Sequence, residues 1–298
     1  MHSQFTSLHT HTVFCDGEDD IETMCSAAYA KGLAAIGFSS HAPLEKTGLK
    51  TWWNMKEARM GEYIAGINAA RRRWEGKLAV YLGLEVDCIK GVRSAMDSDI
   101  RSLNLDYIIG SVHFLAPPYM AHGEPSLDGA FTVDGPETEL EKGITEGYGA
   151  CGETMMHAYW DAAAHMIAIG GIDIVGHLDL VKKNNTANRW FDTESDAYTR
   201  RTAEIVRAIA QSGLVVEVNT GGVTRGYFNE TCPSPKMLRL LRQHDVPVII
   251  TADAHRADNL DSHYPFACQT LLDAGYTHHV TFEGRSNGKA VWKQNLLP

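Results

Sequence analysis

The sequence alternates between short apolar runs and longer amphipathic stretches, and this alternation constrains the fold more than any other feature. The runs are rich in Val, Ile and Leu and cover residues 5–10, 34–39, 79–86, 107–112, 172–178, 215–220 and 246–252, with a weaker one at 279–283. Residues 21–31 and 195–212 have helical patterns, each with an acidic first turn and a following glycine. About seven strand–helix repeats predict an α/β fold whose parallel sheet is covered on both faces.

Chain length and one irregular interval set the expected domain organisation. The 298 residues are 44% hydrophobic, and α/β barrels commonly reach this size as one domain. Residues 114–152 break the repeat and are rich in Pro, Gly and acidic residues. This interval is too long for an ordinary connection, so we expect a lid or an inserted excursion. We therefore predict one barrel domain over residues 1–298, with a long loop insertion at 114–152.

Charge and cysteine content exclude several classes of partner. The formal net charge is −10, and the one run of basic residues is 71–73, which disfavours a nucleic-acid groove. The N-terminus lacks an apolar signal-peptide core, and no stretch approaches 18 apolar residues, so no membrane partner is expected. Six scattered cysteines without a CxxC pair indicate reduced thiols and a cytoplasmic protein. The sequence carries no feature from which an oligomeric state can be predicted.

Most of the predicted strands end in side chains that can bind a metal ion. In SLHTHTVFCDG, after the first run, two alternate histidines would project to the same side of an extended chain. Strand C-termini of an α/β barrel meet at one end, so we expect the candidates to converge there. A single histidine is more often a core residue, but six at one end would be costly to bury without ligands. The candidates are His9, His11, Asp16, His41, Glu85, His113, His177, Asp253 and His255.

The donor atoms of this set narrow the choice of metal. All are nitrogen or oxygen, with no thiolate, which favours Zn, Mn or Fe over a structural cysteine site. Nine candidates are too many for one ion, or comfortably for two. We therefore predict three divalent metal ions, with one carboxylate bridging two of them.

These residues, in this order, resemble the PHP (polymerase and histidinol phosphatase) family. The resemblance runs from SLHTHT to TADAH and so spans nearly the whole chain. Within the family, the chain is most similar to the histidinol-phosphate phosphatases, on the segments GLEVD, GSVHF, FTVDGP, GHLDLVKK, EVNTGG and CPSPKMLRLL. SSH at 39–41, TADAH and GGVTRG depart from the family pattern without removing a ligand. The resemblance implies a distorted (β/α)7 TIM-like barrel with a trinuclear metal site at the strand C-termini.

The resemblance also divides the nine positions into three groups, one for each ion, with one shared carboxylate. The groups are His9, His11, Glu85 and Asp253; Glu85, His113 and His177; and Asp16, His41 and His255. The residues alone give the same nine positions without this division.

The activity that the resemblance implies is hydrolysis of a small phosphate monoester, L-histidinol phosphate above all. Clustered divalent ions generate hydroxide near neutral pH and neutralise phosphoryl oxygens. Lys183 is an alternative to its neighbour Lys182 for contacting the phosphate. The candidate catalytic residues are Glu85, Asp253 and His255, and the candidate phosphate-binding residues are Lys182, Arg225 and His113.

Other residues near the predicted strand ends are candidates for supporting roles. Asp179 and Asn219 could orient ligating histidines from behind, although Asp179 also suits a helix cap. Glu217 could be a buried partner for a neighbour. Trp52 and Trp53, after the second run, could form a pocket wall or simply pack.

Three other functions remain open from the sequence. The chain could be a PHP phosphoesterase acting on a nucleotide or sugar phosphate, an amidohydrolase-like metal hydrolase, or a non-catalytic or nucleic-acid-processing PHP module. The fourth strand ends in GSVH, without the lysine that amidohydrolases commonly use. Acidic residues in the insertion favour a small cationic phosphate ester. They are Glu124, Asp128, Asp134 and Glu137.

Overall fold

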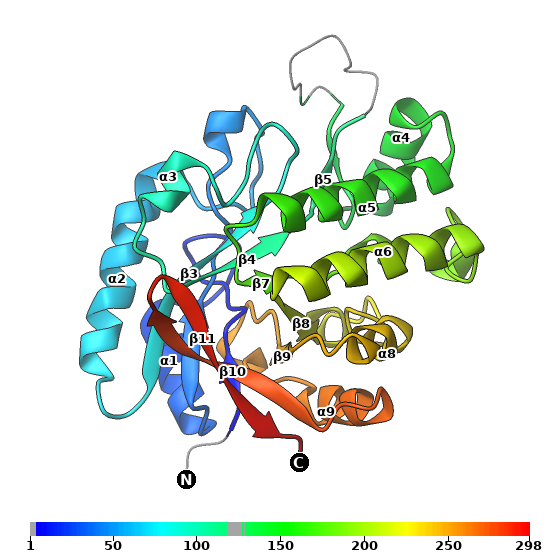
Figure 1. Cartoon of the computed structure of the whole chain (residues 1–298). Coiled ribbons are helices and arrows are strands. Elements are labelled where there is room, and N and C mark those ends of the chain that lie inside the picture. Colours follow the sequence, from blue (N-terminus) through cyan, green and yellow to red (C-terminus); the bar gives the residue numbers. More distant parts are fainter. Residues whose placement is uncertain (1–3, 118–126, 128) are drawn as a thin grey trace.

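The computed structural model describes residues 4–117, 127 and 129–298. The predicted fold class is confirmed: seven parallel strands form one curved sheet in the order β1-β2-β3-β4-β7-β8-β9 (Figure 1). Each strand falls within a predicted apolar run or extends it by one residue. The strands are β1 (Thr6–Ser7), β2 (Ala35–Phe38), β3 (Ala79–Asp87), β4 (Tyr107–Ser111), β7 (Ile174–Val175), β8 (Val215–Asn219) and β9 (Val248–Thr251).

The first and last strands meet just beyond their C-terminal ends, which nearly closes the barrel. Thr10 and Ala254 form an isolated parallel bridge. The His11 amide donates to the Ala254 carbonyl at 2.8 Å, and the Ala254 amide donates to the His9 carbonyl at 3.0 Å. The two ends of the sheet are therefore joined next to predicted metal ligands.

The helices surround the sheet, with α5, α6, α8 and α9 on one side and α1 to α3 on the other (Figure 1). Helix α1 begins where the sequence predicts, at Ile21, and Asp20 caps it by accepting at Oδ1 from the Thr23 amide at 2.8 Å. Among the described residues, no helix is long and apolar enough to span a lipid bilayer. The helices are α1 (Ile21–Ala30), α2 (Met60–Arg73), α3 (Ser98–Arg101), α4 (Glu137–Gly147), α5 (Gly152–Ile169), α6 (Asp196–Ser212), α7 (Gly221–Thr224), α8 (Pro235–Gln243) and α9 (Tyr264–Asp273).

The segment predicted as a long loop, residues 114–152, contains regular structure. Strand β5 (Phe114–Leu115) pairs antiparallel with β6 (Phe131–Thr132), and α4 follows. The Glu139 carboxylate on α4 accepts from the Thr132 amide at 2.8 Å, which ties the helix to the strand pair. The segment is therefore an excursion with its own hairpin and helix, which leaves the barrel directly after His113.

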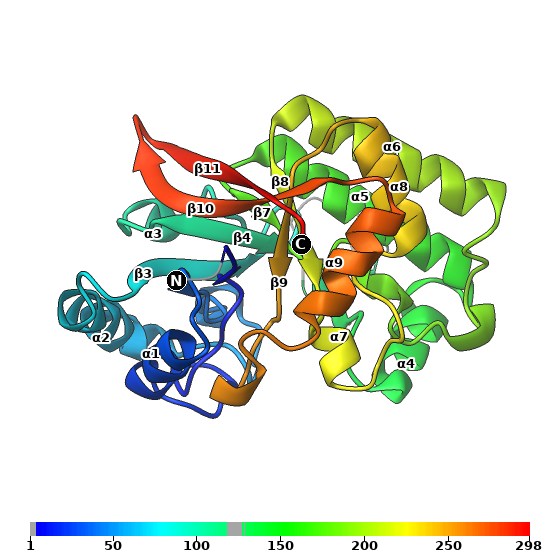
Figure 2. The same cartoon turned by 90° about the horizontal axis from the view of Figure 1, so that it is seen from below.

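A C-terminal hairpin covers the opposite end of the barrel. The weak apolar run at 279–283 lies in β10 (His278–Ser286), which pairs antiparallel with β11 (Lys289–Leu296). The hairpin lies in front of the barrel strands in Figure 1 and toward the top of the view in Figure 2. Its Val280 and Phe282 pack against apolar side chains from the barrel strands. Apolar packing thus closes one end of the barrel and leaves the other end to polar groups.

Tyr107 fills the interior above this hairpin and limits which residues its neighbours can be. Its side chain is fully buried. A Cβ atom added at Gly83 would lie 2.5 Å from the Tyr107 Cζ, and one added at Gly37 would lie 2.5 Å from its Oη. Both positions therefore require glycine, because the Tyr107 ring lies too close for a side chain. Gly83 is on β3, which carries Glu85, and Gly37 is on β2, which leads to His41.

We predict that Gly83→Ala destabilises the protein by about 1–3 kcal/mol, because the added methyl group overpacks the Tyr107 ring. Urea unfolding of the metal-free protein measures this change. Gly61→Ala is the matched control, since a Cβ there on helix α2 meets nothing within 4 Å. A Gly83→Ala protein as stable as Gly61→Ala would contradict the packing account.

Candidate metal centre

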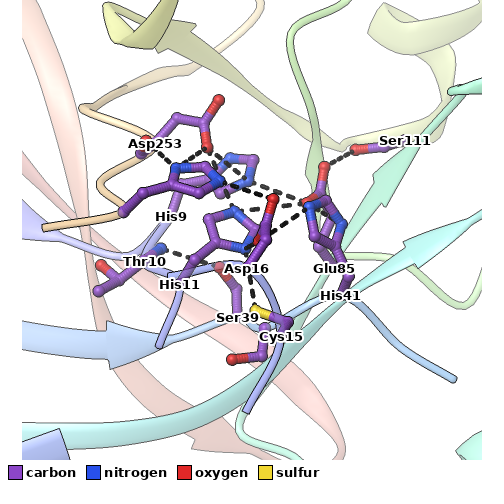
Figure 3. Close-up of polar contacts among 12 residues, drawn as sticks. His9, Thr10, His11, Cys15, Asp16, Ser39, His41, Glu85, Ser111 and Asp253 are labelled. Carbon is purple, nitrogen blue, oxygen red and sulfur yellow. Dashed lines mark hydrogen bonds and ion pairs between the residues drawn. The ribbon is translucent and has the colours of Figure 1, made fainter. Parts of the chain in front are cut away.

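All nine predicted ligands lie together at the C-terminal end of the barrel strands. Figure 3 shows His9, His11, Asp16, His41, Glu85 and Asp253 pointing toward one another. Four groups of side chains place one donor atom each within 4.8 Å of one another, and together they use every predicted position. The groups are His11, Asp16, His41 and His255; His9, Glu85 and His177; His9, His11 and Asp253; and His41, Glu85 and His113. Metal ligation by these residues stays a prediction, but their convergence is a property of the fold.

Glu85, on β3, occupies the middle of the cluster and is fully buried. Its Oε2 lies 2.9 Å from His41 Nδ1 and 3.2 Å from His9 Nε2, and its Oε1 lies 3.0 Å from His177 Nε2. The Ser111 hydroxyl donates to Oε1 at 2.6 Å and fixes the carboxylate from behind. Because different histidines face its two oxygens, Glu85 has the arrangement that a bridging carboxylate requires.

Asp253 joins the two histidines of the His-x-His motif. Its Oδ1 lies 3.2 Å from His11 Nε2 and 3.6 Å from His9 Nε2. Asp253 has a φ of 49°, which is uncommon for a residue other than glycine but is tolerated by aspartate. Arg225 pairs with its second oxygen at 2.8 Å, so one face of the carboxylate points into the cluster and the other meets a cation.

Asp16 and His255 form the more exposed part of the cluster. His255 Nε2 lies 3.2 Å from Asp16 Oδ2, and His41 Nε2 lies 3.7 Å from Asp16 Oδ1. The side chain of His255 is 24% exposed and that of Asp16 is 14% exposed, against 1% for Glu85. This part of the cluster therefore opens toward solvent.

Two buried carboxylates face histidines that are predicted metal ligands, on the side away from the cluster. Glu217 Oε2 lies 2.8 Å from His9 Nδ1, and Asp87 Oδ1 lies 2.8 Å from His113 Nδ1. Glu217 is the buried partner that the sequence suggested. The Asp87 role was missed, although its position two residues after Glu85 places it on the same side of β3.

The remaining candidates for support do not reach a ligating imidazole. Asn219 Nδ2 donates to Glu217 at 3.0 Å. Asp179 accepts from the Ser234 amide at 3.0 Å and pairs with Lys182 at 2.8 Å. Asp179 therefore holds the loop before α8 rather than a metal ligand.

Several buried polar atoms of the cluster lie near one another but make no hydrogen bond of good geometry, which tests whether the residues suit a metal. Buried polar atoms without a partner cost about 1–3 kcal/mol each, and metal coordination would remove this cost. The donor set of nitrogen and oxygen atoms fits divalent Zn, Mn or Fe. The atoms are His9 Nε2, His11 Nε2, Asp16 Oδ1, His41 Nδ1 and Glu85 Oε2.

The carboxylates control the protonation of the metal-free cluster. Burial lowers the pKa of His113, but Asp87 and Glu85 outweigh it and raise this pKa to about 10. Burial also disfavours protonation of His9. The charges of Glu217, Glu85 and Asp253 outweigh burial, so the pKa of His9 lies well above its usual range. Both imidazoles therefore carry protons at neutral pH that a metal ion would displace.

Two cations lie near the mouth of the cluster: Arg225, which the sequence favoured, and Lys183, which the sequence offered as the alternative to Lys182. Lys182 is held by Asp179 and by Glu230 at 2.5 Å. Lys183 instead donates to the Asp134 carbonyl and lies 4.1 Å from the centre of the Tyr227 ring. Burial lowers the pKa of Lys183, and the positive charge of Arg225 acts in the same direction.

Trp53 forms a wall beside the cluster. Its ring lies edge-to-face with His41, at a centroid distance of 4.6 Å, and with His113, at 5.4 Å. It stacks on Phe114 at 5.4 Å, which is the first residue of the excursion. The neighbouring Trp52 is 83% exposed.

A nearly closed parallel barrel with a buried cluster of nitrogen and oxygen donors at its strand C-termini has the arrangement that suits a divalent-metal site. The chain belongs to the PHP domain family, whose sequence profile matches residues 7–221. This match confirms the resemblance found in the sequence.

Similar proteins agree with this assignment over nearly the full chain. The chain is 28% identical to the probable histidinol-phosphatase of Deinococcus radiodurans, over 93% of this chain and 96% of that protein. It is 26% identical to the histidinol-phosphatase of Bacillus subtilis, over 86% and 95%. A crystal structure of histidinol phosphate phosphatase from Lactococcus lactis, complexed with Zn, L-histidinol and phosphate, shares the fold at a TM-score of 0.70 and 22% identity, covering 97% of this chain and 99% of that one.

We predict that zinc binding at pH 7.5 releases protons, one from His9 and one from His113, because a metal binds the neutral imidazole. Calorimetric titration of the metal-free chain in two buffers of different ionisation enthalpy measures this release. Apparent zinc affinity should fall as the pH falls, because the proton competes for the same nitrogen. A heat of binding independent of the buffer would contradict the prediction.

The raised pKa of His113 predicts how the stability of the metal-free protein depends on pH. The pKa of His113 rises on folding from 6.5 to about 10, so its protonated form favours the folded state. This contribution is complete below pH 6.5 and is lost as the pH rises through 10. Urea unfolding between pH 6.5 and 10 should therefore show a declining free energy of unfolding, and Asp87→Asn should reduce the decline.

Proposed function

We propose that this protein is a metal-dependent L-histidinol-phosphate phosphatase with three divalent metal ions. The observation that carries the proposal is Glu85, whose two carboxylate oxygens face histidines of different groups within 3.2 Å. Membership of the PHP domain family and the histidinol-phosphatase names of its relatives support the substrate.

Bound divalent ions would supply a hydroxide nucleophile and neutralise phosphoryl oxygens. The protein's own part is to hold the ligands in place and to position the phosphate. Glu85 and Asp253 supply negative charge where cations gather, and burial strengthens this interaction. Trp53, packed on two of the ligating imidazoles, keeps one wall of the site free of water.

Arg225 and Lys183 would contact the phosphate oxygens. Both lie against the ring of Tyr227, with Arg225 Cζ at 5.8 Å and Lys183 Nζ at 4.1 Å from its centre. The positive charge of Arg225 helps to lower the pKa of Lys183, so the two cations repel each other, and an anion at the mouth of the site would relieve that repulsion. Lys182 stays a weaker candidate because two carboxylates already bind it, and His113 stays a candidate through its place in the cluster.

Asp253 and His255 remain the candidates for donating a proton to the leaving group. His255 is the more exposed of the two. Its Nδ1 lies 3.0 Å from the Asp253 carbonyl, which orients the ring. Its place at the open edge of the cluster suits contact with the ester oxygen.

Asp134 would recognise the cationic amine of the substrate. Glu124 and Asp128 lie outside the described residues, and Glu137 is paired with Arg189. Asp134 is the remaining candidate, and its negative charge acts to raise the pKa of both His113 and Lys183. Its backbone is fixed by Lys183, and Asn184 Nδ2 donates to the adjacent Gly135 carbonyl at 2.9 Å.

We also propose that the enzyme acts in the cytoplasm and without nucleic acid. All six cysteines are free, as expected of a reducing compartment. The net charge of −10 opposes binding of a polyanion. An amidohydrolase-like reaction is disfavoured because Glu85, rather than a lysine, lies at the centre of the cluster.

The substrate is tested by comparing kcat/KM for L-histidinol phosphate, p-nitrophenyl phosphate, a sugar phosphate and a nucleoside monophosphate at equal metal loading. We expect L-histidinol phosphate to exceed each of the others by at least about tenfold, or roughly 1.4 kcal/mol of transition-state binding. If a nucleotide or sugar phosphate gives the highest kcat/KM by the same margin, the protein is still a phosphoesterase but L-histidinol phosphate is not its substrate.

Asp134→Asn should lower kcat/KM for L-histidinol phosphate by about 10–100-fold, since a charge-assisted hydrogen bond contributes about 1.5–3 kcal/mol. The same variant should change p-nitrophenyl phosphate hydrolysis little, because that ester has no amine. Glu137→Gln is the matched control on the adjacent helix. Equal losses for both esters would remove Asp134 from substrate recognition.

Glu85→Gln should lower kcat by more than about 100-fold, because replacing a supporting residue behind a ligand already costs about 10–100-fold. Elemental analysis should show fewer ions per chain, while circular dichroism shows a folded barrel. Glu283→Gln on the distant hairpin controls for loss of charge. Near-normal turnover with full metal content would contradict a bridging role.

A further inference from the structure

The histidines of the cluster differ in what holds them from behind. His9 and His113 each face a buried carboxylate through Nδ1. His255 has a backbone carbonyl and the Arg225 guanidinium, 3.0 and 3.3 Å from its Nδ1. A carboxylate behind an imidazole increases its basicity as a ligand, whereas a neighbouring cation opposes metal binding.

Glu217 has a hydrogen-bond pattern that leaves its carboxylate no freedom. Oε1 accepts from the His177 amide at 2.6 Å and from Asn219 Nδ2 at 3.0 Å. Oε2 accepts from the Thr251 hydroxyl at 2.8 Å and faces His9 Nδ1 at 2.8 Å. Because a carboxylate only accepts, His9 must carry its proton on Nδ1.

This proton position determines what His9 presents to the cluster. With the proton on Nδ1, the lone pair of the neutral ring is on Nε2, which lies 3.2 Å from Glu85 and 3.6 Å from Asp253. The opposite tautomer would place a proton on Nε2 and block it as a ligand. Glu217 therefore selects the tautomer that a metal needs.

A glutamine at position 217 would reverse this selection. Its amide oxygen would have to occupy the Oε1 position, because the His177 amide and the Asn219 side-chain amide both donate there. The NH2 group would then occupy the Oε2 position and donate to His9 Nδ1. His9 would be driven to carry its proton on Nε2.

Asp87 provides a contrast within the same protein. Its Oδ1 faces His113 Nδ1, while its Oδ2 has no hydrogen-bond partner. An asparagine there could keep an oxygen toward His113 and turn its NH2 to the free side. Asp87→Asn would remove charge without reversing the tautomer.

In the group of Asp16, His41 and His255, His41 Nδ1 faces the central Glu85 carboxylate at 2.9 Å, whereas His255 Nδ1 has no carboxylate of the described residues at hydrogen-bond distance. Among the described residues, Asp253 Oδ1 lies 3.7 Å from His255 Nδ1, beyond hydrogen-bond distance, and the Arg225 guanidinium is closer, at 3.3 Å. The side chains of this group are also the most exposed of the cluster. A metal ion held there would meet more solvent and a less basic ligand.

We infer that Glu217 is a positioning residue that fixes the metal-binding tautomer of His9, and that an ion bound by Asp16, His41 and His255 is the first of the three to exchange. This inference rests on the three-ion centre of the proposed function.

The test is chelator titration of the zinc-loaded protein at fixed pH, with ions per chain counted by elemental analysis. The wild type should fall from three ions to two in a first step and lose the rest at higher chelator concentration. Asp16→Asn should load two ions and lack the first step. A single step from three ions to none, or loss of every ion from Asp16→Asn, would overturn the order of exchange.

Glu217→Gln should leave the first step unchanged and shift the later loss to about 10–100-fold lower chelator concentration. Asp87→Asn should shift this later loss of ions by a smaller factor. Asp173→Asn is the control and should shift neither step, because Asp173 is a partly buried carboxylate at the other end of β7 that accepts from the Ile108 amide. Equal shifts for Glu217→Gln and Asp87→Asn would refute the tautomer argument, and thermal unfolding of the metal-free variants verifies that each is folded.

The experiment also separates this inference from the proposed function. A wild-type protein that never binds more than one ion would refute the three-ion centre itself. Three ions that leave together would refute only the inference.

Discussion

The buried Glu85 carboxylate is the interaction on which the rest of the site depends. A charge of this kind is costly to remove from water unless opposite charge surrounds it. Burial alone would raise its pKa, but the imidazoles of His9, His41 and His113 lower it well below the usual range. The strand ends must therefore bring these rings to one point, and that requirement shapes the open end of the barrel.

The two ends of the barrel meet opposite physical demands. At the C-terminal end, carboxylates and imidazoles compensate one another and leave donor atoms free. At the N-terminal end, Tyr107, Val280 and Phe282 are buried in an apolar cluster. Residues at the first end can thus be selected for chemistry while those at the second provide stability.

The sequence predicted the barrel because its buried strands are almost wholly apolar and its helices have clear ends. It did not predict β11, whose partly exposed residues lack a strong pattern, or β5 and β6, which are two residues each. The nine converging residues were found because parallel strands place their C-termini together. The pairing of His9 with Glu217 spans 208 positions, so only the three-dimensional structure identifies the partner.

Neighbouring residues were the hardest to distinguish. Lys182 and Lys183 have the same charge, and which one faces the site depends on the short turn of Leu180–Lys182. That turn directs Lys182 toward Asp179 and Glu230 and leaves Lys183 beside Tyr227. Local sequence pattern does not encode a choice that is made by contacts with distant segments.

The bridge between Thr10 and Ala254 has a consequence for how the protein is made. Ligands from the first and last strands meet only after some 240 intervening residues have been synthesised and folded. Such a contact is of very long range, and contacts of this kind form late and slowly. During synthesis, the N-terminal His-x-His motif must wait for Asp253, so a complete ion-binding centre is a product of folding rather than a nucleus for it.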